Sequence, residues 1–139
     1  KYPCRHVVIT GGEPTLQLTT SLVKLMHDKG LYVMMETNGT QPLPDGCSID
    51  WVTCSPKKAG DALAPIRIQH IDELKVVYEG NGQDMSLYDA IPATEYRLQP
   101  CATGDAEKDR EITAQTIEYI LQHPKWSLSL QTHKMLGVR

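Results

Sequence analysis

The chain has 139 residues, 40% of them hydrophobic and 22% charged, which is enough for one buried core, so a single domain over residues 1–139 is expected. A net charge of −3 and a pI near 5.9 provide no basic stripe for a phosphate backbone, which argues against direct nucleic-acid binding. The sequence has no membrane-length apolar run and no secretory leader, so we expect a cytoplasmic protein with no membrane partner.

Residues 6–10 form the first predicted strand, because a run of Val, Val and Ile suits a buried strand. The strand leads into Thr10-Gly11-Gly12-Glu13-Pro14, where two glycines permit positive φ and let another molecule approach the main chain. Proline is tolerated in the first turn of a helix, so Pro14 and Thr15 are predicted to open a helix that Gly30 terminates. These elements make one βα unit.

The rest of the chain alternates between strands and helices. Further strands are predicted over residues 31–36, 51–54, 73–78, 96–99 and 126–131, with a weak helix over 85–90 and a stronger one over 107–122. In the last strand, Trp126, Leu128 and Leu130 are expected to lie on a helix-covered face. This order favours an α/β fold with a mostly parallel sheet, or an open piece of a barrel.

Polar residues follow five of the predicted strands, at 10–13, 36–38, 55–57, 99 and 131–133. Ligands bind at the carboxyl edge of parallel α/β sheets, so we expect these residues to face a ligand. Glu36 ends an apolar strand, and we expect its side chain to be partly buried and to need a partner. That partner is either a ligand or, in a structural role, Lys75.

The four cysteines are Cys4, Cys47, Cys54 and Cys101. Their spacing matches neither a metal knuckle nor a small disulfide framework, so no metal is assigned to them. Cys54 is predicted to be a core residue, whereas Cys101 either packs or contacts a ligand.

The segment Thr10 to Pro14 resembles the radical S-adenosylmethionine enzymes. More narrowly, the chain is similar to the 7-carboxy-7-deazaguanine synthase family through four segments: Glu36-Thr37-Asn38-Gly39-Thr40, Trp51 to Lys57, Glu73-Leu74-Lys75, and Leu130-Gln131-Thr132-His133-Lys134. The resemblance spans nearly the whole chain and implies an open partial (β/α) barrel of the radical S-adenosylmethionine type. The family's three closely spaced cluster cysteines have no counterpart, so we expect a chain truncated at its N-terminus and inactive alone.

The resemblance implies a carbon–nitrogen lyase of the queuosine pathway. Its reaction contracts the ring of 6-carboxy-5,6,7,8-tetrahydropterin with loss of ammonia, started by a radical from S-adenosylmethionine. The implied cofactors are S-adenosylmethionine, a 4Fe–4S cluster and Mg²⁺. The implied partners are the pterin substrate, a flavodoxin-like or other electron donor, and a second subunit in a homodimer.

The resemblance also assigns binding residues. It implies cofactor contacts for Gly11, Gly12, Glu13, Ser55, Lys57 and Gln99, and pterin contacts for Thr10, Glu36 and His133. The main chain and carboxylate of the Gly-Gly-Glu segment would accept hydrogen bonds from the methionine ammonium. We further expect the terminal carboxylate of Arg139 to contact the pterin. No catalytic residue is assigned, and strand-end turns, a solvated Lys57 and a surface His133 are the structural alternatives.

Three other functions stay open. A radical enzyme that activates a partner protein's glycine would keep residues 11–14 but has no need of residues 131–134. A nucleoside-binding module without a cluster would begin naturally near Lys1. A conventional barrel enzyme for a phosphorylated sugar would need a glycine-rich phosphate loop after the late strands, and the sequence has none there.

Overall fold

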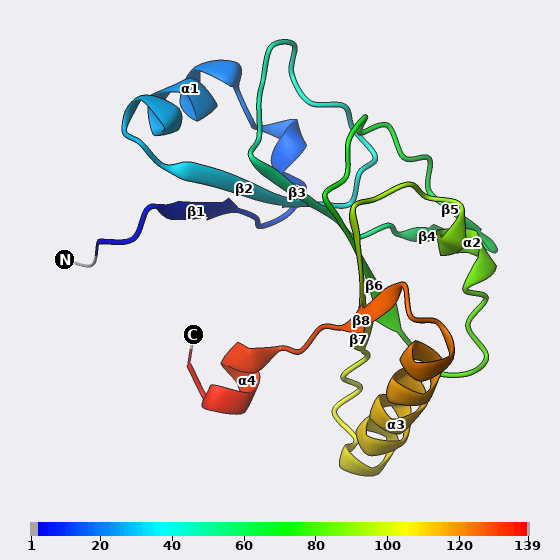
Figure 1. Ribbon diagram of the computed structural model, residues 1–139. Coiled ribbons are helices and arrows are strands. Elements are labelled where there is room, and N and C mark those ends of the chain that lie inside the picture. The colour runs from blue at the N-terminus through cyan, green and yellow to red at the C-terminus, as the bar shows by residue number, and fades with distance from the viewer. Residues whose placement is uncertain (1–2, 139) are drawn as a thin grey trace. The chain divides into compact units, whose positions relative to one another are not determined.

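The computed structural model describes residues 3–138 (Figure 1). Its elements are β1 (His6–Ile9), the 3₁₀ helix η1 (Pro14–Leu16), α1 (Thr20–Asp28), β2 (Tyr32–Thr37), β3 (Trp51–Cys54), β4 (Lys58–Ala59), β5 (Ala62–Leu63), β6 (Glu73–Tyr78), α2 (Ser86–Asp89), β7 (Glu95–Pro100), α3 (Ala106–Gln122), β8 (Trp126–Leu128) and α4 (Thr132–Leu136). No helix in this part of the chain is long and apolar enough to cross a membrane.

Over the described residues, six strands are hydrogen-bonded in the order β1-β2-β3-β6-β7-β8. The pairs β1–β2, β2–β3, β3–β6 and β7–β8 are parallel. The expected α/β class with an open, mostly parallel sheet is therefore confirmed. The chain divides into two compact units, residues up to 74 with 92–94, and residues 75–91 with 95 onward.

In the first unit, β1, β2 and β3 run side by side and α1 joins β1 to β2 (Figure 1). One face of β2 is buried through Val33 and Met35, both 0% exposed, and Thr37 follows them in the same alternation. Gly30 follows the C-cap residue of α1 and has φ of 70°, the left-handed conformation that terminates helices. Its predicted role as the helix terminator is confirmed.

The first helix differs from its prediction. Pro14 begins only the short 3₁₀ helix η1, and α1 starts six residues later at Thr20. The hydroxyl of Thr19 accepts a hydrogen bond from the backbone N–H of Leu22, which caps a new helix there. The two segments are therefore separate helices.

The hairpin of β4 and β5, which pair antiparallel directly after Lys57, was not predicted from the sequence. Its signal was present, since Gly60 and Asp61 form the two-residue connection and Gly60 has φ of 69°. The short strands contain Lys58-Ala59 and Ala62-Leu63, which carry little strand propensity.

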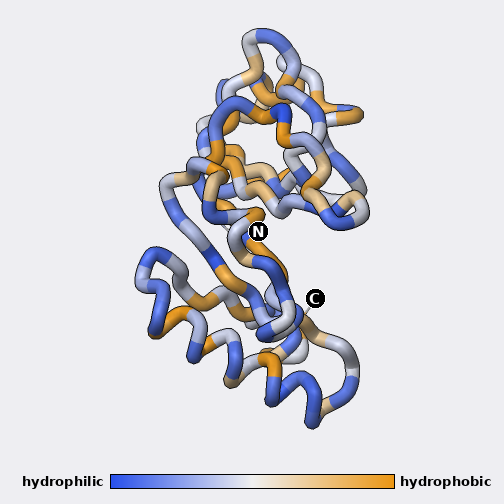
Figure 2. Tube along the Cα trace, turned by 90° about the vertical axis from the view of Figure 1, so that its right-hand side faces the viewer, coloured by the Kyte–Doolittle hydropathy of each residue, from blue (hydrophilic) through white to orange (hydrophobic). Residues whose placement is uncertain are grey.

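In the second unit, α3 packs against β7 and β8. The Asp105 carboxylate caps α3 by accepting from the N–H groups of Glu107 and Lys108. Figure 2 shows hydrophilic and hydrophobic stretches alternating along this helix, as its amphipathic sequence predicts. The core of this unit includes Val76, Tyr78, Tyr88, Leu98, Ile112 and Trp126.

The last strand is shorter than predicted. β8 ends at Leu128, and Leu130 is 46% exposed instead of lying on a covered face. Its partner β7 ends at Pro100, which has no N–H for a further ladder bond. The chain then forms α4 from Thr132, a helix that was not predicted from the sequence.

Candidate functional site

Polar residues after three strands of the first unit line one shallow pocket of about 200 Å³. Its lining comprises Thr10, Gly11, Gly12 and Glu13 after β1, Glu36, Thr37 and Asn38 at the end of β2, and Ser55 and Lys57 after β3. Because the three strands are parallel neighbours, their carboxyl ends meet at one edge. Seven residues assigned from the resemblance are thereby brought together, and Thr37 and Asn38 join them.

The Glu13 carboxylate joins the glycine turn to the end of β2. Its Oε1 accepts from the Thr15 hydroxyl at 2.6 Å, the Thr15 N–H at 3.2 Å and the Thr37 hydroxyl at 2.6 Å. Its Oε2 accepts from the backbone N–H of Asn38 at 2.8 Å. Glu13 thus has a structural role that was not predicted from the sequence, beside its predicted role in binding.

These hydrogen bonds change the acidity of Glu13. Burial raises its pKa, but the hydrogen bonds from Thr15, Thr37 and Asn38 together outweigh burial and hold the pKa below the ordinary 4.5. At a pH just below 4.5, the Glu13 carboxyl is therefore less protonated in the folded protein than in the unfolded chain.

We expect Glu13 to contribute stability above pH 4.5, its ordinary pKa, that is lost as pH falls through the lowered folded-state pKa. In the variant Glu13→Gln this part of the acid dependence should be absent. Urea unfolding of both proteins across the acid range measures it: the gap in unfolding free energy should be largest near neutral pH and narrow toward low pH. A gap that does not change with pH would contradict the expectation.

The turn after β2 is held by its own side chains. The Thr37 hydroxyl accepts from the Gly39 N–H at 3.0 Å, and the Asn38 side-chain oxygen accepts from the N–H and hydroxyl of Thr40. Gly39 is buried with φ of 77°, and a Cβ there would lie 2.7 Å from the Cys54 Sγ. The turn therefore packs closely on β3.

The glycine turn presents open backbone. Gly11 has φ of 128°, so a side chain would strain it. Gly12 has no such restriction, and a Cβ there would meet no protein atom within 4 Å. The fold itself does not require glycine at position 12. The close approach of a ligand to this backbone would be a physical reason for a residue without a side chain there.

The remaining predicted residues of this unit differ in exposure. Ser55 is half-buried and Lys57 is exposed. The expectation that Glu36 is partly buried is wrong, because its side chain is exposed at the pocket. Strand alternation explains this: Thr37 takes the buried face with Val33 and Met35, and Glu36 takes the other.

The second unit contains a separate hollow of about 210 Å³ at the ends of β7 and β8, lined in part by Gln99, Cys101, Gln131 and Lys134. His133 is exposed on α4 and does not line this hollow. Arg139, predicted to contact the pterin, lies outside the described residues. The predicted ligand contacts of Gln99, His133 and Arg139 remain predictions.

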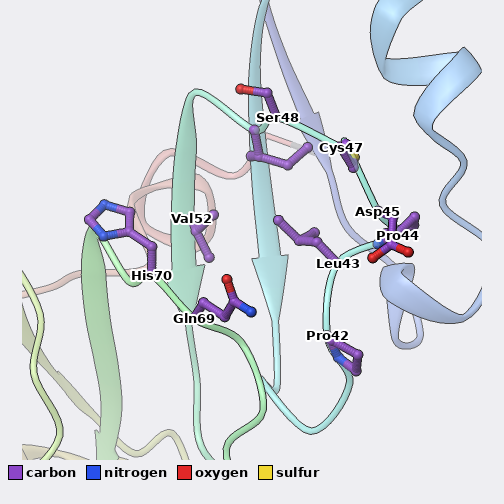
Figure 3. A pocket seen from close by; sticks show the side chains of 11 residues that line it. Pro42, Leu43, Pro44, Asp45, Cys47, Ser48, Val52, Gln69 and His70 are labelled. Atoms are coloured by element: carbon purple, nitrogen blue, oxygen red, sulfur yellow. The ribbon is translucent and has the colours of Figure 1, made fainter.

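A larger cavity of about 340 Å³ lies elsewhere in the first unit. Figure 3 shows its side chains coming from the loop between β2 and β3, from Val52 on β3, and from Gln69 and His70 before β6. It contains none of the residues that the sequence assigned to a ligand. Its size alone does not make it the functional site.

The cysteines are free thiols in different surroundings. Cys54 is a core residue, as predicted, and burial first, then the negative charge of Glu13, raise the pKa of its thiol to about 12 despite the opposing charge of Lys57. Among the described residues no three His, Cys, Asp or Glu side chains converge as metal ligands. A 4Fe–4S cluster therefore does not fit the ligands of this part of the chain.

No family model matches the sequence. The chain is 48% identical over 139 residues to the 7-carboxy-7-deazaguanine synthase of Bacteroides thetaiotaomicron, covering 100% of this chain and 68% of the relative. It is 41% identical over 135 residues to the enzyme of that name from Bradyrhizobium diazoefficiens, covering 97% and 60%. The chain belongs to the 7-carboxy-7-deazaguanine synthase family.

A solved structure agrees with this assignment. The crystal structure of QueE from Escherichia coli matches with a TM-score of 0.72 and 28% identity, over 94% of this chain and 57% of that one. The chain thus spans about two thirds or less of the length of these relatives. Membership of the 7-carboxy-7-deazaguanine synthase family confirms the radical S-adenosylmethionine resemblance and the open α/β architecture.

Proposed function

We propose that the whole protein is a 7-carboxy-7-deazaguanine synthase, which converts 6-carboxy-5,6,7,8-tetrahydropterin to 7-carboxy-7-deazaguanine with loss of ammonia. The observation that carries this proposal is 48% identity to a named synthase across the full chain. The pocket that gathers the family's strand-end residues supports it. This makes the protein a lyase of queuosine biosynthesis rather than an activase of another protein.

S-Adenosylmethionine fits the chemistry of the pocket. The bare backbone of Gly12 allows close approach, and the Glu13 Oε2 keeps acceptor capacity for an ammonium group. Ser55 and Lys57 supply a hydroxyl and a long donor for the ribose and its surroundings. When bound, this cofactor and the iron–sulfur cluster supply the radical chemistry, and the chain's own residues bind and orient the reactants.

The pterin would contact Thr10 and Glu36. An exposed carboxylate at the pocket can accept hydrogen bonds from the amide–guanidine edge of the pterin, and the Thr10 hydroxyl can orient the ring. Gln99 would contact the nucleoside, while His133 and the terminal carboxylate of Arg139 would complete the pterin contacts.

The cluster, Mg²⁺ and the electron donor complete the proposal. The cysteines that hold the cluster would come from a part of the whole protein that the 139-residue sequence does not include. The 139-residue chain alone should therefore form no product. Mg²⁺ would assist the reaction, and a flavodoxin-like protein would deliver electrons. A cytoplasmic location and a homodimer are part of the same proposal.

The test uses the protein produced from the start codon of its gene, reconstituted with iron and sulfide without oxygen. S-Adenosylmethionine, the tetrahydropterin, Mg²⁺ and a reductant are added, and products are identified by mass. We expect 7-carboxy-7-deazaguanine. Formation of 5′-deoxyadenosine without 7-carboxy-7-deazaguanine would overturn the assignment of the tetrahydropterin as substrate. Absence of both products would favour a nucleoside-binding module.

A further inference from the structure

Thr37 is a polar residue on the buried face of β2. Its alternation places it with Val33 and Met35, and only 4% of it is exposed. A buried hydroxyl without hydrogen bonds destabilises a fold, so its partners matter. Thr37 donates to the Glu13 Oε1 at 2.6 Å and accepts from the Gly39 N–H at 3.0 Å.

The direction of these bonds is fixed by chemistry. An ionised carboxylate only accepts, and a backbone N–H only donates, so the single hydroxyl hydrogen must point to Glu13. Thr37 therefore couples the Gly39 turn to the glycine turn that carries Glu13, across 24 residues of sequence.

The two carboxylate oxygens of Glu13 have unequal surroundings. Oε1 accepts from both donors of Thr15 and from Thr37. Oε2 accepts from the backbone N–H of Asn38, which leaves it a second lone pair for another donor. Glu13 lines the pocket, where such a donor can reach it.

We propose that Thr37 is a positioning residue, which holds the Glu13 carboxylate by Oε1 so that Oε2 is presented to the ammonium group of the bound cofactor. This inference rests on the proposed function and deepens it. Thr37 acts through Glu13, because its hydroxyl already donates to the Glu13 Oε1 and accepts from the Gly39 N–H. Its hydroxyl also keeps the carboxylate ionised, because a donor to the charged form favours that form.

The test substitutes Thr37→Val in the full-length reconstituted enzyme, which removes the hydroxyl and keeps the shape. The KM for S-adenosylmethionine should rise about tenfold with kcat within about twofold, because ground state and transition state lose the same contact. The acidic limb of kcat/KM for this cofactor should move to higher pH, since Glu13 loses a donor. A purely structural role would not produce that pH shift.

Two further variants isolate the hydroxyl. Thr37→Ser keeps the donor and should remain within about twofold of the parent KM. Thr40→Val removes a hydroxyl that donates to the Asn38 side chain at 2.7 Å in the same turn without touching Glu13. Thr40→Val should leave the pH profile of kcat/KM unchanged. If Thr40→Val raised the KM and moved the acidic limb of kcat/KM as much as Thr37→Val does, the inference would be overturned.

A titration separates this inference from the proposed function. Carbon-13 NMR of labelled glutamate carboxyls should give a higher Glu13 pKa in Thr37→Val than in the parent, whether or not either protein turns over. An unchanged pKa, or an unchanged KM in an active enzyme, would overturn the positioning role. If Thr37→Val does not fold, Thr37→Cys replaces it, because the thiol keeps a weak donor. Thr37→Cys should raise the KM for S-adenosylmethionine and the pKa of Glu13 by less than the loss of the donor would.

Discussion

Replacing Gly39 by alanine should lower the free energy of unfolding by about 3 kcal/mol, combining backbone strain with overpacking. The backbone φ of 77° disfavours any side chain, and the new Cβ would lie 2.7 Å from the Sγ of the fully buried Cys54. Ile66 and Ile68 also lie within 4 Å of that Cβ, which limits relaxation. Urea unfolding monitored by circular dichroism measures the change.

A matched variant separates the two causes. Gly46 has nearly the same φ, 70°, but a Cβ there would meet nothing within 4 Å. Gly46→Ala should therefore cost only the strain, about 1 kcal/mol. In the background Cys54→Ala, the cost of Gly39→Ala should also fall, because the colliding sulfur is gone. Equal costs for Gly39→Ala and Gly46→Ala would contradict the packing argument.

Replacing Gly12 by alanine should raise the KM for S-adenosylmethionine at least about tenfold, equal to about 1.4 kcal/mol of binding. The unfolding free energy should change by less than about 0.5 kcal/mol, because the new Cβ strains nothing and collides with no protein atom. The effect arises only if a ligand lies against this backbone. Steady-state kinetics of 5′-deoxyadenosine formation and urea unfolding measure the two quantities.

Gly82→Ala is the control for this substitution. Gly82 also has no positive φ, and a Cβ there would meet no atom within 4 Å, but it does not line the pocket of Gly12. It should change neither KM nor stability. An unaltered KM in Gly12→Ala would show that the cofactor does not approach the glycine turn closely.

Local sequence determined most of the elements and the chemistry at their ends. The β-branched run before Thr10 makes β1, and the glycines after it make an open turn, because propensity and side-chain size act over a few residues. The sequence also carried a signal for Thr37, a hydroxyl in the register of Val33 and Met35, which needs a hydrogen-bond partner. The family resemblance rested on such local segments and the comparisons confirm it.

Only the tertiary structure decided which distant groups meet. The hydrogen bonds of Glu13 to Thr37 and Asn38 join segments 24 and 25 residues apart. They form because the parallel pairing of β1 with β2 places both strand ends together. The order of elements favoured a parallel sheet, but it did not specify which strands are neighbours or their register. The early end of β8 has the same origin, because the length of its neighbour β7 limits how far the two strands can pair.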